Sequence, residues 1–177
     1  AMQGLSYSFE EPNLKELYLN LLTAASDKRR TADAHPAFAD VIKQLTPREA
    51  ALLNNFLPEP QLTIVRLKEV VEPGVYQTKM THLLPLANET GEPVEEPQAP
   101  TWVDNWIRLG LVEVTYTHYQ KGNSAYDWVT QCPEYIRVSQ EPEITKLEFD
   151  RGLLWPTAFG KRFHRAVTPL GDSIKTP

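Results

Sequence analysis

The sequence has a single cysteine, Cys132, among its 177 residues. One cysteine excludes a disulfide framework and a cysteine-based zinc site within the chain. It suits a reducing compartment, and we expect a cytoplasmic protein. No apolar run approaches the roughly 18 residues that a membrane-spanning helix needs, and no secretory signal opens the sequence. We therefore expect a soluble protein without a membrane span.

Catalytic and cofactor-binding signatures are also missing. The sequence contains no G-x-S-x-G nucleophile elbow, no P-loop, no G-x-G-x-x-G fingerprint and no H-E-x-x-H zinc motif. The histidines are dispersed at His35, His82, His118 and His164, without the short spacing that metal ligands usually show. We predict no catalytic, cofactor-binding or metal-binding residues.

Four residues with reactive or acidic side chains receive structural interpretations. His35 precedes a proline at a helix start, and we interpret its side chain as a cap rather than as a metal ligand or an acid/base group. Cys132 shows no local nucleophile signature and precedes Pro133 in a predicted loop, which favours a structural or incidental thiol. We interpret the Glu95–Glu96 pair as solvated charge in a connecting segment.

The formal net charge is −5, from 18 Lys and Arg against 23 Asp and Glu. This balance disfavours broad nucleic-acid binding, which needs a concentrated Lys/Arg surface. A local basic face is compatible with it, and the candidates are residues 28–30, Arg48 and residues 161–165. The alternative is that these cations are ordinary helix surface, some of them complementing helix dipoles.

The first 57 residues predict three amphipathic helices. Leu14–Ser26 carries apolar residues at helical spacing, and Asn13 is a candidate N-cap. A second helix is predicted over Pro36–Leu45. Thr46-Pro47-Arg48-Glu49 is a capping box that starts the third helix. We expect residues 14–57 to pack as one helical layer.

The middle segment, residues 61–100, has a different character. Gln61–Val71 alternates and predicts a strand, although both of its faces carry apolar groups. Pro73-Gly74 marks a turn. Val75–Leu86 is compatible with either a strand or a helix. Glu92–Pro100 is rich in proline and glutamate and predicts an extended, solvated connection.

The last third predicts a helix, a strand, a hairpin and a closing helix. The first helix begins at Thr101 and stops at Gly110, and a strand follows over Leu111–Tyr119. Residues 124–143 read as irregular. Asp150-Arg151-Gly152 is the predicted turn of a hairpin between strands 145–149 and 153–155, and Thr157–Val167 is the closing helix. Residues 168–177 are predicted to be a frayed tail.

This order of elements over residues 101–167 resembles a winged-helix domain, in which the helix from Thr101 would be the recognition helix. The predicted fold is therefore α+β: N-terminal amphipathic helices packed with a winged-helix-like C-terminal half that carries a small antiparallel sheet. We expect residues 1–177 to form a single domain. Trp106 is predicted to lie in the core and Trp102 to be exposed. The candidate binding surface consists of Trp102, Asn105, Arg108, Lys161, Arg162 and Arg165.

Several segments together resemble one protein family. Leu14–Asp27 (LKELYLNLLTAASD), residues 34–38 (AHPAF) and residues 42–46 (IKQLT) resemble the helical block of the Abi-alpha family. Trp106–Glu113 (WIRLGLVE) and residues 159–163 (FGKRF) are similar to the later landmarks of that family, in the same order. The family is named for abortive infection, a bacterial response to phage. Its members carry a helical segment ahead of this region, so the resemblance implies that the chain is a C-terminal domain fragment.

Three functional hypotheses follow. The first is a non-enzymatic interaction or regulatory domain of a bacterial abortive-infection-type phage-defence protein, which contacts a protein partner or associates with itself. The second is a winged-helix nucleic-acid-binding module, which predicts one basic face and salt-sensitive binding. The third is an enzyme with an unrecognised site, which requires a pocket with converging titratable groups. We rank them in this order.

Overall fold

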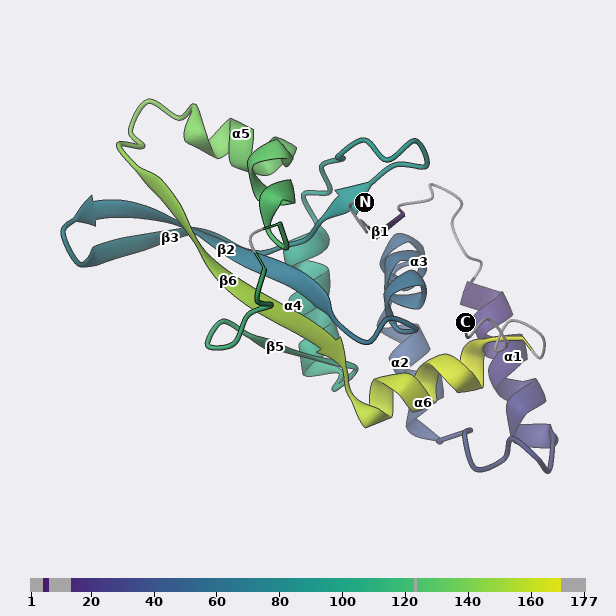
Figure 1. Cartoon of the computed structure of the whole chain (residues 1–177). Helices are drawn as coiled ribbons and strands as arrows, with labels where there is room; N and C mark the ends of the chain where they lie inside the picture. Colours follow the sequence, from purple (N-terminus) through teal and green to yellow (C-terminus); the bar gives the residue numbers. More distant parts are fainter. Residues whose placement is uncertain (1–4, 7–13, 123, 170–177) are drawn as a thin grey trace.

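The computed structural model describes residues 5–6, 14–122 and 124–169 of the chain (Figure 1). These residues form six α-helices, one short 3-10 helix and six strands, and the mixed α+β class is confirmed. The helices are α1 (Leu14–Ser26), α2 (Ala37–Lys43), α3 (Pro47–Phe56), α4 (Ala99–Arg108), η1 (Asp127–Gln131), α5 (Pro133–Ser139) and α6 (Ala158–Val167). The strands are β1 (Leu5–Ser6), β2 (Leu62–Glu72), β3 (Val75–Leu83), β4 (Leu86–Ala87), β5 (Val112–Thr115) and β6 (Leu147–Pro156).

The predicted N-terminal helices are present, and the capping box of α3 is confirmed. The Thr46 hydroxyl accepts a hydrogen bond from the Glu49 amide at 3.3 Å, and the Glu49 carboxylate accepts one from the Thr46 amide at 3.1 Å. These two bonds satisfy amides that the helix itself leaves free. The predicted cap at Asn13 lies outside the described residues.

The closing helix α6 packs along α1, so residues distant in the sequence share one helical layer (Figure 1). The Asn20 side chain donates to the carbonyl of Val167 at 2.9 Å, and the Tyr18 hydroxyl donates to the carbonyl of Ala39 at 3.0 Å. The first bond joins α1 to α6 and the second joins α1 to α2. The C-terminal helix is therefore part of the layer that the sequence assigned to residues 14–57 alone.

Four of the strands form an antiparallel sheet in the order β3-β2-β6-β5. The central strand β2 contributes to two separate cores. Leu62 and Ile64 face the helical layer and α4, whereas Val65 and Leu67 face a second core beneath η1 and α5. This double burial is the reason that both faces of the segment carry apolar residues.

The hairpin predicted at residues 150–152 is wrong, because β6 continues through this segment as one strand. It pairs with β2 from Leu62↔Leu154 to Glu69↔Leu147 without interruption. Gly152 lies inside the strand for a packing reason: a Cβ there would approach the Thr115 carbonyl oxygen to 2.5 Å and the Tyr116 ring to 2.7 Å. The glycine that signals a turn in the sequence is required here for close approach of a ring. The wing hairpin is therefore not formed.

A hairpin does form elsewhere, between β2 and β3. Pro73-Gly74 is its turn, as predicted, and Gly74 has a φ of +84°, a conformation that favours glycine. Val75–Leu86 resolves into strands β3 and β4 rather than a helix. Pairing with β2 decides between the two, since the local pattern is compatible with both.

Other predicted boundaries need correction. The fourth helix begins at Ala99 instead of Thr101, and the predicted strand from Leu111 to Tyr119 is shorter, covering only β5. Residues 124–143, predicted to be irregular, contain η1 and α5, whose apolar side chains cover the second face of the sheet. Within the part of the chain that the structure describes, no helix has the length and apolarity needed to cross a membrane.

We predict that Gly160→Ala destabilises the protein by about 1–3 kcal/mol, because a Cβ at this position in α6 would overlap the carbonyl oxygen of Leu111. At an unhindered helical position the same change stabilises by up to about 1 kcal/mol, so the sign of the effect is diagnostic. Urea unfolding measures the difference. The neighbouring exposed change Lys161→Ala is the control, and equal or higher stability of the Gly160→Ala protein would contradict this packing.

Candidate interaction surface

Two cations on the central strand share one carboxylate. Arg66 and Lys68 are alternate residues of β2, so their side chains lie on the same face of the sheet. Arg66 Nη2 is 2.7 Å from one oxygen of Asp150 and Lys68 Nζ is 2.6 Å from the other. Burial opposes ionisation of Asp150, but the bonds from Lys68 and Arg66 outweigh it, and its pKa lies below the ordinary value. Asp150 is thus a fixed anion at neutral pH.

His82, near the end of β3, is held in an unusual backbone conformation. Its φ is +56°, in the left-handed region that residues other than glycine rarely adopt. Its amide donates to the hydroxyl oxygen of Tyr116 at 3.1 Å, and that hydroxyl lies 3.0 Å from the ring Nδ1 of His82. The ring Nε2 is 3.2 Å from a carboxylate oxygen of Asp104.

These contacts assign a single hydrogen-bonding order. The Asp104 carboxylate can only accept, so the proton of the neutral imidazole lies on Nε2; Nδ1 then accepts the proton of the Tyr116 hydroxyl, whose oxygen accepts from the His82 amide. The chain of bonds joins β3, the segment after β5, and α4. The strained backbone of His82 is stabilised by contacts with two other elements.

Burial shapes the ionisation of this group. Burial lowers the pKa of His82, and this effect outweighs the charge and hydrogen bond of Asp104, which raise the pKa. It also raises the pKa of Tyr116 to about 12. At neutral pH the imidazole is neutral and the phenol is protonated, so neither offers an activated nucleophile.

Two aromatic rings pack against Arg66 and Lys68. The Arg66 guanidinium lies 4.7 Å from the centre of the Tyr116 ring, and Lys68 Nζ lies 4.1 Å from the centre of the Tyr76 ring. Such stacking holds both partners in place. Six residues on this part of the sheet are together called the polar row: Arg66, Lys68, His82, Asp104, Tyr116 and Asp150.

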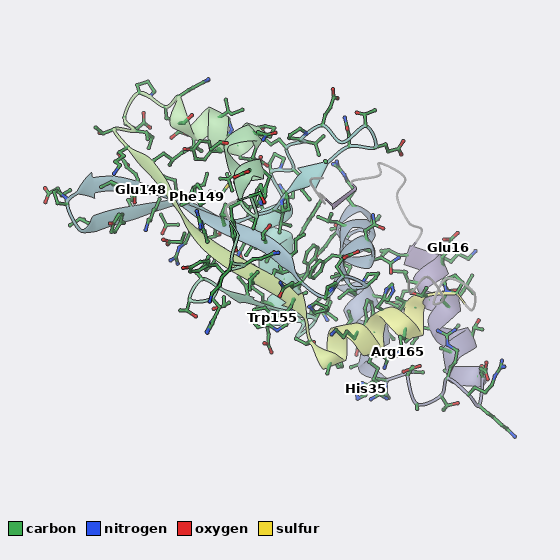
Figure 2. All side chains as sticks on the ribbon, in the orientation of Figure 1. Glu16, His35, Glu148, Phe149, Trp155 and Arg165 are labelled. Atoms are coloured by element: carbon green, nitrogen blue, oxygen red, sulfur yellow. The ribbon has the colours of Figure 1, made fainter. Side chains whose placement is uncertain are left out.

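The β2–β3 hairpin beyond the polar row exposes apolar side chains. Figure 1 shows this hairpin extending away from α1, α2, α3 and α6. Val71, Val75 and Tyr76 are exposed to 54%, 50% and 50% respectively. We call these three residues the hairpin tip. Glu148 and Phe149 of β6 lie toward this end of the sheet, whereas Trp155 lies toward α6 (Figure 2).

The predicted binding surface divides into two groups with different contacts. In α4, Trp102 is only 7% exposed, so the prediction of an exposed Trp102 is wrong, while burial of Trp106 is confirmed. Trp102, Val103 and Trp106 face the core together, at helical spacing. Asn105 donates to the Gln44 carbonyl at 3.0 Å and to Glu49 at 2.7 Å.

Arg108 completes the α4 group by donating to the Asn105 side chain at 2.6 Å. Burial raises the pKa of the Glu49 carboxyl that Asn105 contacts, and the bond from Asn105 opposes this effect. Asn105 therefore joins α4 to the start of α3.

The α6 group contacts the connection between α1 and α2. Arg165 donates to the Asp33 carboxylate at 3.0 Å and Arg162 donates to the Asp33 carbonyl at 3.3 Å, while Lys161 is exposed. Arg30 donates to the carbonyls of Arg165 and Thr168, at the C-terminal end of α6. Arg30, Arg162 and Arg165 therefore make contacts within the chain. Figure 2 shows Arg165 on α6, far along the molecule from Glu148.

The interpretations of His35 and Cys132 are confirmed. The His35 ring accepts a hydrogen bond from the Ala37 amide at 3.1 Å, at the start of α2. Cys132 is buried, its thiol donates to Glu134 at 2.7 Å, and burial raises its pKa, so it is poorly reactive. Within residues 5–6, 14–122 and 124–169, no group of three His, Cys, Asp or Glu is arranged to hold a metal ion.

The interpretation of Glu95–Glu96 as solvated charge is wrong for Glu96. Its side chain is 4% exposed and lies 3.1 Å from Arg48 Nη2. The Glu96 amide also approaches the buried carboxylate of Glu134 at 3.4 Å. A buried charge of this kind needs a partner, and Arg48 supplies it. The segment before α4 is therefore packed against α3 and α5.

Sequence reasoning missed the His82–Tyr116–Asp104 chain. Its members are separated by at least 12 residues along the sequence and show no motif spacing. The alternation of β2, however, places Arg66 and Lys68 on the face that begins with Leu62 and Ile64. A change from apolar to basic along one face is the signal that marks where the core stops.

Comparison with known proteins places the chain among relatives. Residues 1–167 match the family model described as abortive infection alpha. A comparison with curated proteins finds no match. One similar solved structure is an uncharacterized protein from the marine bacterium Alcanivorax borkumensis SK2, with 14% identity and a TM-score of 0.49, covering 81% of this chain and 99% of that chain. The match covers nearly the whole chain and does not single out a C-terminal part of the family, so the expectation of a C-terminal domain fragment is not supported.

We predict that Tyr116→Phe destabilises the protein by about 1–3 kcal/mol, because the His82 amide and ring nitrogen both lose their partner. Tyr119→Phe is the matched control, since it removes a hydroxyl from a ring that is 54% exposed, and we expect a change within about 0.5 kcal/mol. Urea unfolding at neutral pH compares them. Equal effects of the two substitutions would contradict the proposed bonding order.

We also predict that stability falls as the pH falls below about 6.5, since the pKa of His82 in the folded protein lies below its ordinary value. Below about pH 6.5, His82 binds a proton in the unfolded chain but stays neutral in the folded one, so a fall in pH favours unfolding. His82→Asn removes the titration and tolerates a positive φ. The loss of unfolding free energy between about pH 7.5 and about pH 5 should be smaller in this variant, though still present because burial lowers the pKa of His164 too. An identical pH dependence in both proteins would show that His82 is not involved.

Proposed function

The chain belongs to the abortive infection alpha family, and from this premise we propose that it is a non-enzymatic interaction domain of a phage-defence protein. We further propose that the hairpin tip is the surface that meets a protein partner. The polar row then has the role of a rigid base that holds this hairpin in position. The observation that carries the proposal is the group of three half-exposed apolar and aromatic side chains, Val71, Val75 and Tyr76, at the end of an extended hairpin.

The ionisation of the polar row supports a non-enzymatic role. A general base or nucleophile needs a pKa matched to its task and access to a substrate. Tyr116 has a pKa of about 12 and its proton is directed to His82. Arg66 and Lys68 are both bonded to Asp150. The charges in this row are directed at one another, which favours a structural role for them.

The chemistry of the hairpin tip supports a protein partner. Interfaces between proteins favour aromatic and apolar side chains at their centre and exclude acidic and lysine side chains from it. The tip offers two valines and a tyrosine whose ring is held by Lys68 at 4.1 Å. A ring that is already ordered loses little conformational entropy on binding.

Nucleic-acid binding is the alternative function. Arg162 and Arg165 contact Asp33, and Arg66 and Lys68 contact Asp150. Phosphate contacts would compete with these acidic partners. Fluorescence anisotropy with duplex and single-stranded DNA at two salt concentrations distinguishes the hypotheses. Submicromolar binding that weakens with salt would favour the nucleic-acid module over the protein partner.

We predict that Val75→Ser combined with Tyr76→Ser abolishes phage protection while leaving the fold intact. Plating efficiency is measured for phages against which the unaltered protein protects its host, and protection should fall at least about tenfold, as expected for loss of interface anchors. Leu22→Ser is the control, because Leu22 is 62% exposed on α1, away from the hairpin. Immunoblots confirm equal abundance. Retained protection in the tip variant, or equal loss in the control, would contradict the assignment of the hairpin tip.

A further inference from the structure

Arg151 of β6 carries a positive charge that no carboxylate within the described part of the chain neutralises. The cations of the polar row contact Asp150, whereas neither Arg151 nor Lys121 forms an ion pair among residues 14–122 and 124–169. Asp150 precedes Arg151 in the sequence but lies on the opposite face of β6. The side chains of Arg151 and Lys121 are exposed, so both charges can meet an anion from outside the chain.

Two tyrosine rings hold the guanidinium of Arg151 in place. Its central carbon, Cζ, lies 5.3 Å from the centre of the Tyr126 ring and 6.0 Å from the centre of the Tyr119 ring. A ring attracts the cation through its face and does not use the N–H groups at the edge of the guanidinium, which stay free to bond an anion. Tyr126 is buried, whereas Tyr119 is 54% exposed, so part of one ring is open to solvent beside the cation.

Hydrogen bonds of Tyr126 fix the loop that carries Tyr119 and Lys121. The Tyr126 hydroxyl accepts from the Gln120 amide at 3.1 Å and donates to the Gly152 carbonyl at 2.9 Å. Gln120 lies between Tyr119 and Lys121, and Gly152 lies in β6, so the loop runs beside β6 at this position (Figure 1). We call the three exposed residues that meet here the loop surface: Tyr119, Lys121 and Arg151.

The loop surface offers the two kinds of contact with which proteins bind single-stranded nucleic acids. Phosphate groups bond arginine and lysine, and unpaired bases stack on exposed aromatic rings. An arginine beside an aromatic ring adds a second plane on which a base can stack. A duplex keeps its bases stacked on one another, and an acidic peptide offers carboxylates alone, so each would use the cations without the ring.

From these observations we propose that the loop surface binds single-stranded nucleic acid, with a base stacked on Tyr119 and phosphates bonded by Arg151 and Lys121. The proposal goes beyond the proposed function and does not rest on it, because the loop surface and the hairpin tip share no residue. It also differs from the binding surface predicted from the sequence, whose arginines contact Asn105 and Asp33.

The expected affinity is modest, because the net charge of −5 opposes the approach of a polyanion. We expect a dissociation constant of about 10–100 µM at physiological salt, within the range of non-specific binding. With two phosphate contacts, the logarithm of the binding constant should fall with the logarithm of the salt concentration with a slope of about −1.4. Binding of this strength is weaker than the submicromolar binding expected of a winged-helix nucleic-acid module.

Salt dependence provides the first test, measured by fluorescence anisotropy with labelled oligothymidine of about 12 nucleotides. Arg151→Gln and Lys121→Gln should each reduce the size of the slope by about 0.7, because each removes one phosphate contact. Lys161→Gln, which removes an exposed lysine of α6, is the control and should leave the slope unchanged. Urea unfolding confirms that each variant is folded, and Lys121→Gln carries the test if Arg151→Gln is not. Unaltered slopes in both loop-surface variants, an equal reduction in Lys161→Gln, or no binding at about 500 µM protein would overturn the proposal.

The aromatic ring provides a second test. Tyr119→Leu should weaken binding about fivefold or more, whereas Tyr119→Phe, which keeps the ring, should bind as the unaltered protein does. Equal affinity of these two variants, or of the unaltered protein for a duplex of the same length, would show that no base is stacked and would overturn the proposal. Tighter binding of oligoglutamate than of oligothymidine would also overturn it and assign the surface to an acidic protein segment. Val75→Ser combined with Tyr76→Ser should bind oligothymidine normally, so the hairpin tip and the loop surface are tested separately.

Discussion

The structure depends on β2 being buried on both faces. Its side chains alternate between two cores, with Leu62 and Ile64 on one side and Val65 and Leu67 on the other. A shift of one residue in its pairing would exchange the two faces, so both cores specify the same register. Each fully buried Leu or Ile contributes about 1.5–3 kcal/mol, and the strand holds several. The helical layer and the η1–α5 cover are therefore positioned by a single strand.

The polar row exists because one of these cores ends before the strand does. Beyond Ile64 the same face of β2 continues with Arg66 and Lys68, past the apolar contacts of α4 and the helical layer. Charged groups at this border need partners, and Asp150 on β6 lies directly across from Arg66 in the register. Tyr116 covers Gly152 at the border itself, and its hydroxyl reaches His82. The strain at His82 is thus located where three elements meet and can stabilise it.

Much of the helical architecture was predictable from the sequence, while the arrangement of the sheet was not. The capping box at Thr46, the cap at His35 and the amphipathic stripe of α1 are local features, determined by residues a few positions apart. Gly152 shows the limit of that reasoning, since its role depends on a ring 36 positions away in the chain. Glu96 shows another limit: its burial depends on Arg48, which no local pattern connects to it. The candidate surface failed at Trp102 because the helix begins two residues earlier than its apparent cap.

The β2–β3 hairpin is likewise ordered by contacts between residues distant in the sequence. Beyond the polar row, a tight turn joins β2 to β3, and β2 pairs with β6 on its other side. This pairing orders the hairpin, so it does not need a core on both of its faces. Its backbone is fixed by pairing at one edge and free at the other. An ordered hairpin loses little entropy when it binds a partner, in contrast to a loop that must order on binding. The contacts of Asp150, Arg66 and His82 at its base therefore hold the exposed end in the position in which we propose that it meets a partner.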